Sequence, residues 1–303
     1  MVDSRWRLQW LGAVFSAAAM VGCGGGSGSA PEVRETVYGT LRGVDDSAVT
    51  GTYAWKGVPF AKPPVGELRW QPPAAPAAWS GERDATRFGS ACLQMGRIYG
   101  PGANNRFDNT IGETLGTPVG SEDCLTLNIW TPGLYDARRP VLVWLHGGGF
   151  AAGSGHDIPA FDGENLARTG DAVVVTLNHR LNLLGFLDLS SWGDDYADSA
   201  NVGMLDIVAA LAWIRDNITR FGGDPERVTI FGQSGGGAKV TALMAMPAAR
   251  GLFHRAAILS GSFAMFNTPD RSAQLSALLL AELGIARGDG AALQALPYAA
   301  LRA

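Results

Sequence analysis

The feature that most constrains the fold is a serine between glycines, the pattern G-x-S-x-G at residues 232–236. The apolar run 227–231 before it predicts a strand, and the small and apolar residues 237–243 after it predict a helix. In this setting the sharp turn lifts the serine hydroxyl out of the sheet, where a base can reach it. The pattern therefore predicts a nucleophile elbow with Ser234 at its tip.

The glycines of this pattern have a steric role. The turn crowds the backbone on both sides of the serine, so the positions of Gly232 and Gly236 leave no room for a Cβ atom. The helix that follows directs its N-terminal amides and its dipole toward an anion forming beside the serine. Because the chain has 41 glycines in 303 residues, the pattern alone also allows a glycine-rich turn with an ordinary capping serine. The strand and helix around it favour the elbow.

Composition places the chain among globular proteins with long loops. Hydrophobic residues make up 47% of the chain and charged residues 17%, and 16 prolines interrupt it, which excludes a coiled coil or a disordered chain. The net charge is -4 and no basic run stands out, so nucleic acid is not an expected partner.

The N-terminus has the organisation of an export signal. Arg5 and Arg7 precede an apolar stretch over 8–21, which is short for a transmembrane helix. We therefore predict a signal peptide at 1–22 and an exported protein.

A cysteine follows this stretch directly. Residues 20–23 resemble a bacterial lipobox, in which Cys23 is lipidated and becomes the mature N-terminus. Residues 23–32 then form a flexible tether, and the expected location is the periplasm or a membrane to which lipidated Cys23 attaches the protein. The alternative is a plain cleaved signal with an incidental cysteine, in a secreted protein.

The two other cysteines, Cys92 and Cys124, are candidates for a disulfide. An exported chain with three cysteines leaves one unpaired, and Cys23 has its own explanation. Two free buried thiols are the alternative.

Apolar runs that alternate with helical segments predict an α/β fold. A helix is expected over 201–220, where apolar residues keep helical spacing. We expect a mostly parallel central sheet with helices on both faces, which binds ligands at the carboxyl ends of its strands. The proline-rich segment 57–73 and the glycine-rich segment 96–120 are expected to be irregular, and the second to border a substrate entrance. The expected strands are 36–41 and 51–56 as an antiparallel start, the half-buried 124–130, and the fully covered 141–145, 172–177, 228–231 and 256–259.

A second glycine cluster follows the strand predicted over 141–145. His146 is followed by three glycines at 147–149 and then by Phe150. Successive glycines free the backbone amides to point at one place, which is what the oxyanion of a tetrahedral intermediate requires. A flexible glycine loop is the alternative, but this cluster and the predicted elbow each follow a core strand, which favours an oxyanion hole.

Longer stretches of the chain resemble one protein family. Residues 221–236 resemble the serine signature of the type-B carboxylesterase and cholinesterase family, and residues 122–132 resemble its second signature. Further similarities lie at 57–73, 178–186 and 260–262, so the resemblance extends over 33–303.

The resemblance implies an α/β-hydrolase fold over 33–303 and hydrolysis of a small-molecule ester through an acyl-enzyme. It implies no cofactor, and since no two histidines have metal-ligand spacing we expect no metal site. The roles that it implies are a nucleophile, Ser234, three oxyanion donors, Gly148, Gly149 and Gly235, and a disulfide between Cys92 and Cys124.

Two residues depart from the family pattern beside the serine. Gln233 stands where the family often has glutamate, which weakens the case for a cationic, choline-like substrate. Gly235 stands where alanine is usual. Only its amide is needed, so we expect the glycine to be tolerated at some loss of rigidity.

The acid and the histidine of a triad follow the serine along the chain in this fold. After Ser234 the sequence has one histidine, His254, whose place at a helix-to-strand boundary predicts a structural role. The acids there do not match the family's triad position, and Glu282 lies within a helical run over 276–283. We therefore expect the triad acid and histidine beyond Ala303, in a C-terminal part that this chain lacks.

Three interpretations follow. The first is a serine carboxylic ester hydrolase, truncated and with reduced or no activity. A non-catalytic, cholinesterase-like binding module is the alternative, although such a module has no need of Ser234 or of the three glycines. A broken gene whose product does not fold is the third, because lost strands leave an exposed sheet edge.

Overall fold

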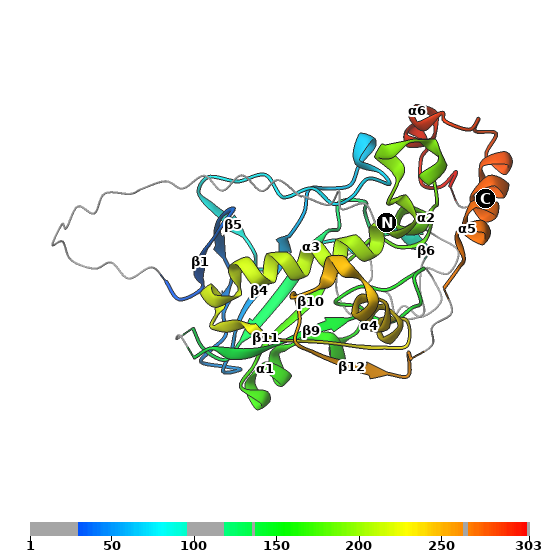
Figure 1. Ribbon diagram of the computed structural model, residues 1–303. Helices are drawn as coiled ribbons and strands as arrows, with labels where there is room; N and C mark the ends of the chain where they lie inside the picture. Colours follow the sequence, from blue (N-terminus) through cyan, green and yellow to red (C-terminus); the bar gives the residue numbers. More distant parts are fainter. Residues whose placement is uncertain (1–29, 96–117, 135–136, 263–265, 302–303) are drawn as a thin grey trace, which may run out of the picture. The chain divides into compact units, whose positions relative to one another are not determined.

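The fold of the computed structural model is built on a mixed sheet of seven strands, in the order β12-β11-β9-β10-β8-β4-β3 (Figure 1). Their bounds are β3 (Val44–Asp45), β4 (Tyr53–Pro59), β8 (Thr126–Thr131), β9 (Arg139–Leu145), β10 (Val173–Leu177), β11 (Gly223–Gln233) and β12 (Arg255–Leu259).

The structure describes residues 30–95, 118–134, 137–262 and 266–301. The predicted signal peptide, Cys23 and most of the glycine-rich segment 96–120 lie outside the described residues.

The sheet has a parallel half and an antiparallel half. β9 pairs in parallel with β10 on one side and with β11 on the other, and β11 pairs in parallel with β12. β8 pairs antiparallel with β10 and β4, and β4 pairs antiparallel with β3. The α/β prediction is confirmed, and Ser234 lies in the parallel half.

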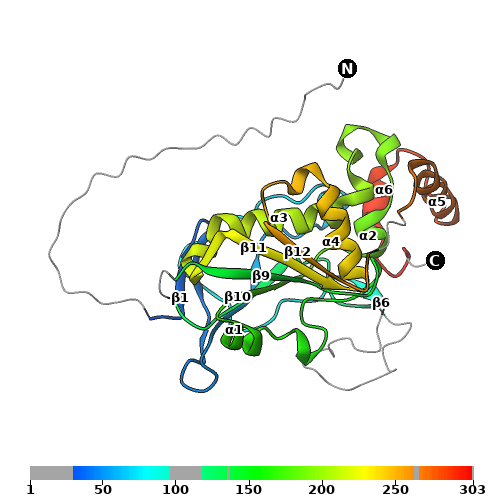
Figure 2. The same cartoon turned by 60° about the horizontal axis from the view of Figure 1, so that its bottom comes forward.

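Helices cover both faces of this sheet. α1 packs against β8 and β10, whereas α3 and α4 lie on the opposite face and contact β11 (Figures 1 and 2). β10 is buried at every position, as expected of an apolar strand covered on both faces. The prediction of a covered strand over 256–259 was wrong in its burial: β12 forms there, but all its residues are exposed, because it is the edge strand of the described sheet. The segment 194–221, which contains α3, is long and apolar enough to cross a membrane, but α3 packs within the core. The bounds are α1 (Glu164–Gly170), α2 (Asn182–Phe186), α3 (Val202–Asn217), α4 (Gly235–Ala245), α5 (Pro269–Glu282) and α6 (Gly290–Ala295).

A second, smaller core joins α2, which lies between β10 and β11 in the chain, to α5 and α6, which follow β12. Leu184 of α2, Leu280 of α5 and Leu293 of α6 are buried together with Trp70 from the proline-rich segment. These helices group together beyond one end of α3 and α4 (Figure 2).

The N-terminal segment differs from the expectation. We predicted one extended piece over 36–41, but the chain turns there and forms a hairpin. The hydroxyl of Thr36 accepts the amides of Tyr38 and Gly39, both at 3.2 Å, which stabilises the turn locally. The strands outside the central sheet are β1 (Val33–Thr36), β2 (Gly39–Arg42) and β5 (Glu82–Asp84), and the pair β6 (Gln94–Met95) and β7 (Pro118–Val119).

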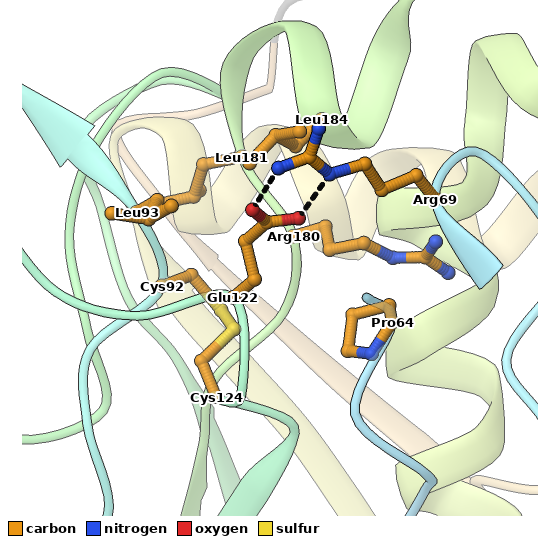
Figure 3. A pocket seen from close by; sticks show the side chains of 9 residues that line it. All are labelled: Pro64, Arg69, Cys92, Leu93, Glu122, Cys124, Arg180, Leu181 and Leu184. Atoms are coloured by element: carbon orange, nitrogen blue, oxygen red, sulfur yellow. Dashed lines mark hydrogen bonds and ion pairs between the residues drawn. A yellow bond between two sulfur atoms is a disulfide. The ribbon is translucent and has the colours of Figure 1, made fainter. Parts of the chain in front are cut away.

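The predicted disulfide between Cys92 and Cys124 is present, beside an ion pair (Figure 3). Arg69 binds Glu122 and also donates to the carbonyl of Leu296 at 2.5 Å. The cavity at this place has a volume of ≈ 10 Å³, enough for about one water molecule. This junction therefore has a structural role, tying the last described segment to the body of the fold.

Candidate functional site

Ser234 lies in the tight turn that joins β11 to α4. Its backbone has φ 57° and ψ -123°, a conformation that costs a non-glycine residue on the order of 1–3 kcal/mol. Two hydrogen bonds hold it there: its amide donates to Leu259 at 2.9 Å, and its carbonyl accepts the amide of Ala238 at 3.0 Å. The turn presents the half-buried serine at the carboxyl ends of the parallel strands.

Glycines surround the serine because backbone segments meet there. A Cβ atom on Gly236 would lie 2.0 Å from the carbonyl oxygen of Leu145, at the end of β9. One on Gly232 would lie 2.6 Å from the carbonyl carbon of Gly236. Gly261, in the family-like segment 260–262, meets Ser234 in the same way, since a Cβ atom there would lie 2.3 Å from the carbonyl oxygen of Ser234. All three glycines therefore permit backbone packing that no other residue allows.

The loop of three glycines at 147–149 packs directly against the elbow. A Cβ atom on Gly147 would lie 3.7 Å from the Cβ of Ser234. One on Gly235 would lie 2.4 Å from the amide nitrogen of Gly149. The structure therefore brings the predicted oxyanion residues Gly149 and Gly235 into contact. Gly148 (φ 90°) and Gly149 (φ 65°) have the left-handed backbone that favours glycine.

Gly235 has a larger effect on the packing of the site than we expected from the sequence. We expected the glycine in place of the family's usual alanine to be tolerated with some loss of rigidity. In the structure it is the lack of a Cβ that lets Gly149 approach, since a Cβ atom would also lie 2.5 Å from the Cα and carbonyl oxygen of Gly149. The close contact between elbow and loop depends on this glycine.

Hydrogen bonds fix the far end of the glycine loop. The amides of Ala151 and Ala152 donate to the carbonyl of Gly148 at 3.3 and 3.2 Å. The side chain of Gln94 then makes a paired contact with the backbone of Gly153, with bonds of 2.7 and 3.0 Å. Because Gln94 follows the disulfide-bonded Cys92 closely, the disulfide steadies the segment that holds this loop.

Buried polar side chains lie under the near end of the loop. The rings of His146 and His179 are stacked, with centroids 4.8 Å apart and planes 8° apart. Burial, and secondarily the charge of Lys239, hold the pKa of His179 well below its ordinary value. Lys239 is itself fully buried on α4 and donates to the carbonyl of His146 at 2.9 Å. Lys239 was not among the predicted site residues, although a single charged residue in a helix of small and apolar residues is a visible signal.

The other histidines lie in structural environments. His254 accepts the amide of Val228 at 3.3 Å and lies 3.6 Å from Glu226, at the amino end of β12. His156 stacks on Phe88 at 4.9 Å, and burial lowers its pKa to about 4. Within the part of the chain that the structure describes, Ser234 makes no hydrogen bond to a histidine.

The acids after Ser234 have ordinary places in the later helices. Asp270 lies in the first turn of α5, Glu282 ends that helix, and Asp289 caps α6 by accepting the amide of Ala292 at 3.0 Å. Among the described residues, no group of three or more His, Cys, Asp and Glu side chains is placed to hold a metal ion.

A cavity of ≈ 350 Å³ opens beside the loop. It begins at the residues that follow the three glycines and continues between α2 and α5, and apolar side chains form most of its wall. The lining residues are Phe150, Ala151, Asn182, Leu183, Phe186, Leu187, Asn267, Ser272, Leu275, Ser276 and Leu279.

Comparison with known proteins supports the same family. Residues 30–294 match the Carboxylesterase family. The chain is 43% identical to para-nitrobenzyl esterase of Bacillus subtilis (strain 168), over 85% of this chain and 49% of that protein. It is 45% identical to phenmedipham hydrolase of Pseudarthrobacter oxydans, over 77% of this chain and 43% of that protein.

A solved carboxylesterase of Geobacillus stearothermophilus superposes with a TM-score of 0.77 at 44% identity, over 89% of this chain and 52% of that one. The α/β-hydrolase fold and the family resemblance are thereby confirmed. The chain spans about half the length of the relatives it matches.

Proposed function

The chain belongs to the carboxylesterase family, and from this premise we propose that it acts on carboxylic esters through a serine acyl-enzyme, with Ser234 as the nucleophile. The observation that carries the proposal is the strained backbone of Ser234, held in contact with a loop of three glycines. Strain of this kind persists where the surrounding structure demands it, and it concentrates at functional sites.

The reaction follows from this arrangement. The Ser234 Oγ attacks the ester carbonyl carbon while a base takes its proton, and the carbonyl oxygen becomes an oxyanion. The backbone amides of Gly148, Gly149 and Gly235 are the proposed donors to that oxyanion. The base then gives this proton to the leaving oxygen, so that the alcohol departs and an acyl-enzyme remains, which water hydrolyses to the acid and free serine.

The general base is the part that the described residues do not supply. His254 lies at the opposite end of the strands, and the remaining histidines are engaged under or beside the loop. We therefore place the histidine and the acid beyond Ala303. On this proposal the 303 residues alone have low turnover or none, because an oxyanion hole without a base retains only a small part of catalysis.

The surroundings favour a neutral, partly apolar ester. Gln233, beside the nucleophile, is exposed and uncharged, and the cavity next to Phe150 has mostly apolar walls. Two of the relatives are named for para-nitrobenzyl esters and for pyrethroids, the para-nitrobenzyl esterase of Bacillus subtilis and a pyrethroid hydrolase of Rattus norvegicus. The cavity would take the acyl or the alcohol group.

Export remains part of the proposal. The disulfide between Cys92 and Cys124 supports an oxidising compartment. Signal cleavage and lipid attachment at Cys23 are predictions from the sequence alone.

Hydrolysis of p-nitrophenyl butyrate tests the proposal, with Ser234→Ala as the blank. We expect slow turnover or none, with any turnover lost in the variant, together with a covalent adduct on Ser234 of the wild type after incubation with diethyl p-nitrophenyl phosphate. An ordinary enzymatic rate would support the esterase and contradict the placement of the base beyond Ala303. Neither turnover nor adduct above the blank would overturn the proposal and favour a binding module.

A further inference from the structure

Lys239 is a charged residue in a place that usually excludes charge. It lies on α4, is 0% exposed, and its position is five residues after Ser234. Burying an amine costs free energy unless strong acceptors receive it. The contacts of its Nζ atom therefore indicate what the residue does.

Two of those contacts bracket the loop of three glycines. Nζ donates to the carbonyl of His146, the residue before the glycines, at 2.9 Å. It also lies 5.6 Å from the ring centroid of Phe150, the residue after them, within the range of a cation-π contact. A single side chain thus contacts both ends of the segment 147–149.

The three glycines at 147–149 need contacts that order their backbone. Glycine has the greatest backbone freedom of all residues, so three in succession lose the most conformational entropy when they are ordered. The amides of Gly148 and Gly149 stabilise an oxyanion only if they are ordered before it forms. Because Lys239 belongs to the helix that starts at the nucleophile, it fixes the loop relative to Ser234 itself.

We propose that Lys239 is a positioning residue that holds the oxyanion loop against the helix carrying the nucleophile. The catalytic meaning of this role rests on the proposed function, whereas the positioning itself does not. The residue acts through the backbone of the loop and needs no contact with the substrate.

Amide hydrogen exchange tests the positioning without any need for turnover. The amides of Ala151 and Ala152, which are bonded to Gly148, report whether the loop is ordered. In Lys239→Met, which keeps the length of the side chain and removes the donor, we expect these amides to exchange about 10-fold faster, as for the loss of one charge-assisted hydrogen bond. Lys56→Met is the matched control, because Lys56 contacts the rings of Phe88 and Trp130 instead of the loop.

Two outcomes overturn the proposal: unchanged exchange at 151–152 in Lys239→Met, or equal acceleration in Lys56→Met. If Lys239→Met does not fold, Phe150→Leu gives a second test. It removes only the ring, and we expect about threefold faster exchange at the same two amides, since cation-π contacts are weaker than charged hydrogen bonds. Unchanged exchange in that variant overturns the proposal as well.

Kinetics separate this inference from the proposed function. If wild-type protein shows serine-dependent turnover of p-nitrophenyl butyrate, Lys239→Met is expected to lower kcat about 10- to 100-fold with little change in KM, because the oxyanion exists in the transition state and not in the bound ester. A rise in KM at constant kcat would overturn the positioning role in catalysis. Absence of both turnover and the Ser234 adduct in the wild type, combined with faster exchange in Lys239→Met, would reject the esterase and retain the positioning role.

Discussion

The two ends of the strand pair β11 and β12 differ in packing and in strain. At the carboxyl end the chain enters a strained turn at Ser234, and backbone from three segments, 145–149, 232–238 and Gly261, meets without side chains between them. At the amino end His254 and Glu226 face solvent, with side chains 30% and 75% exposed and 3.6 Å apart. The candidate reactive site therefore lies where backbone segments are packed closely together, and not where two titratable side chains meet at the surface.

His254 and Ser234 lie at opposite ends of the strand pair, too far apart to act together. His254 pairs with Val228, six positions before Ser234 on β11, which amounts to about 20 Å at roughly 3.3 Å per residue. A base must lie within hydrogen-bond reach of the proton it takes. His254 is therefore excluded as the partner of Ser234 in this conformation.

The largest effect on stability is expected from Gly236→Ala at the carboxyl end. The added Cβ meets the backbone oxygen of Leu145, which cannot rotate away as a side chain can. We expect the free energy of unfolding to fall by about 3 kcal/mol or more, measured by urea denaturation. Gly170→Ala is the control, since a Cβ there has no neighbour nearer than 3.9 Å and should change stability by less than about 0.5 kcal/mol. Equal losses in the two variants would contradict the close packing.

A smaller and more local effect is expected from Gly235→Ala. The family's usual alanine here meets Gly149 at 2.4–2.5 Å, so the oxyanion loop must move away from the elbow. We expect serine-dependent kcat to fall about 10- to 100-fold, less than the full loss of an oxyanion donor. Unchanged turnover would show that the loop adapts to alanine without cost.

The pH dependence of stability should also distinguish the ends. Burial depresses the pKa of His179, so the unfolded chain binds its proton more readily than the folded one. The resulting stability is complete above about pH 6.5 and is lost as the pH falls below it, by up to about 1.4 kcal/mol per pH unit. Urea denaturation between pH 7 and 5 should give a shallower dependence for His179→Gln than for the wild type. Parallel profiles would mean that His179 does not contribute.

The smallest effect is expected at the amino end. His254→Ala removes an exposed, long ion pair and one acceptor, and should lower stability by less than about 1 kcal/mol. Serine-dependent turnover should stay within about twofold of the wild type, because the residue is far from the site. A loss of tenfold or more would bring His254 into the mechanism and break the contrast between the two ends.

Some element boundaries were missed although the sequence held the signal. We expected a helix over 276–283, whereas α5 begins at Pro269. Thr268 caps it by accepting the amide of Arg271 at 3.3 Å. A capping threonine followed by proline is a standard helix start, so this boundary was predictable from local chemistry.

The sequence by itself determined the elements whose causes are local. Apolar runs placed β9, β10, β11 and β12 as strands, and for β10 the reason is that a strand covered on both faces needs apolar side chains at every position. The run in β12 gave the strand but not its burial, since β12 is an exposed edge strand of the described sheet. The glycines around Ser234 were predictable because a sharp turn excludes Cβ atoms whatever the rest of the chain does.

Only the tertiary structure decided the contacts between segments far apart in the chain. Lys239 reaches the carbonyl of His146 across 93 residues, and Gln94 holds Gly153 across 59. The backbone groups of His146 and Gly153 that receive these side chains cannot be recognised in the sequence. Every residue has a backbone carbonyl, so a hydrogen bond to the backbone places no demand on the identity of the residue that supplies it. The closeness of Gly235 to Gly149 likewise depends on how β9 and β11 pair, which sets the two glycine clusters side by side.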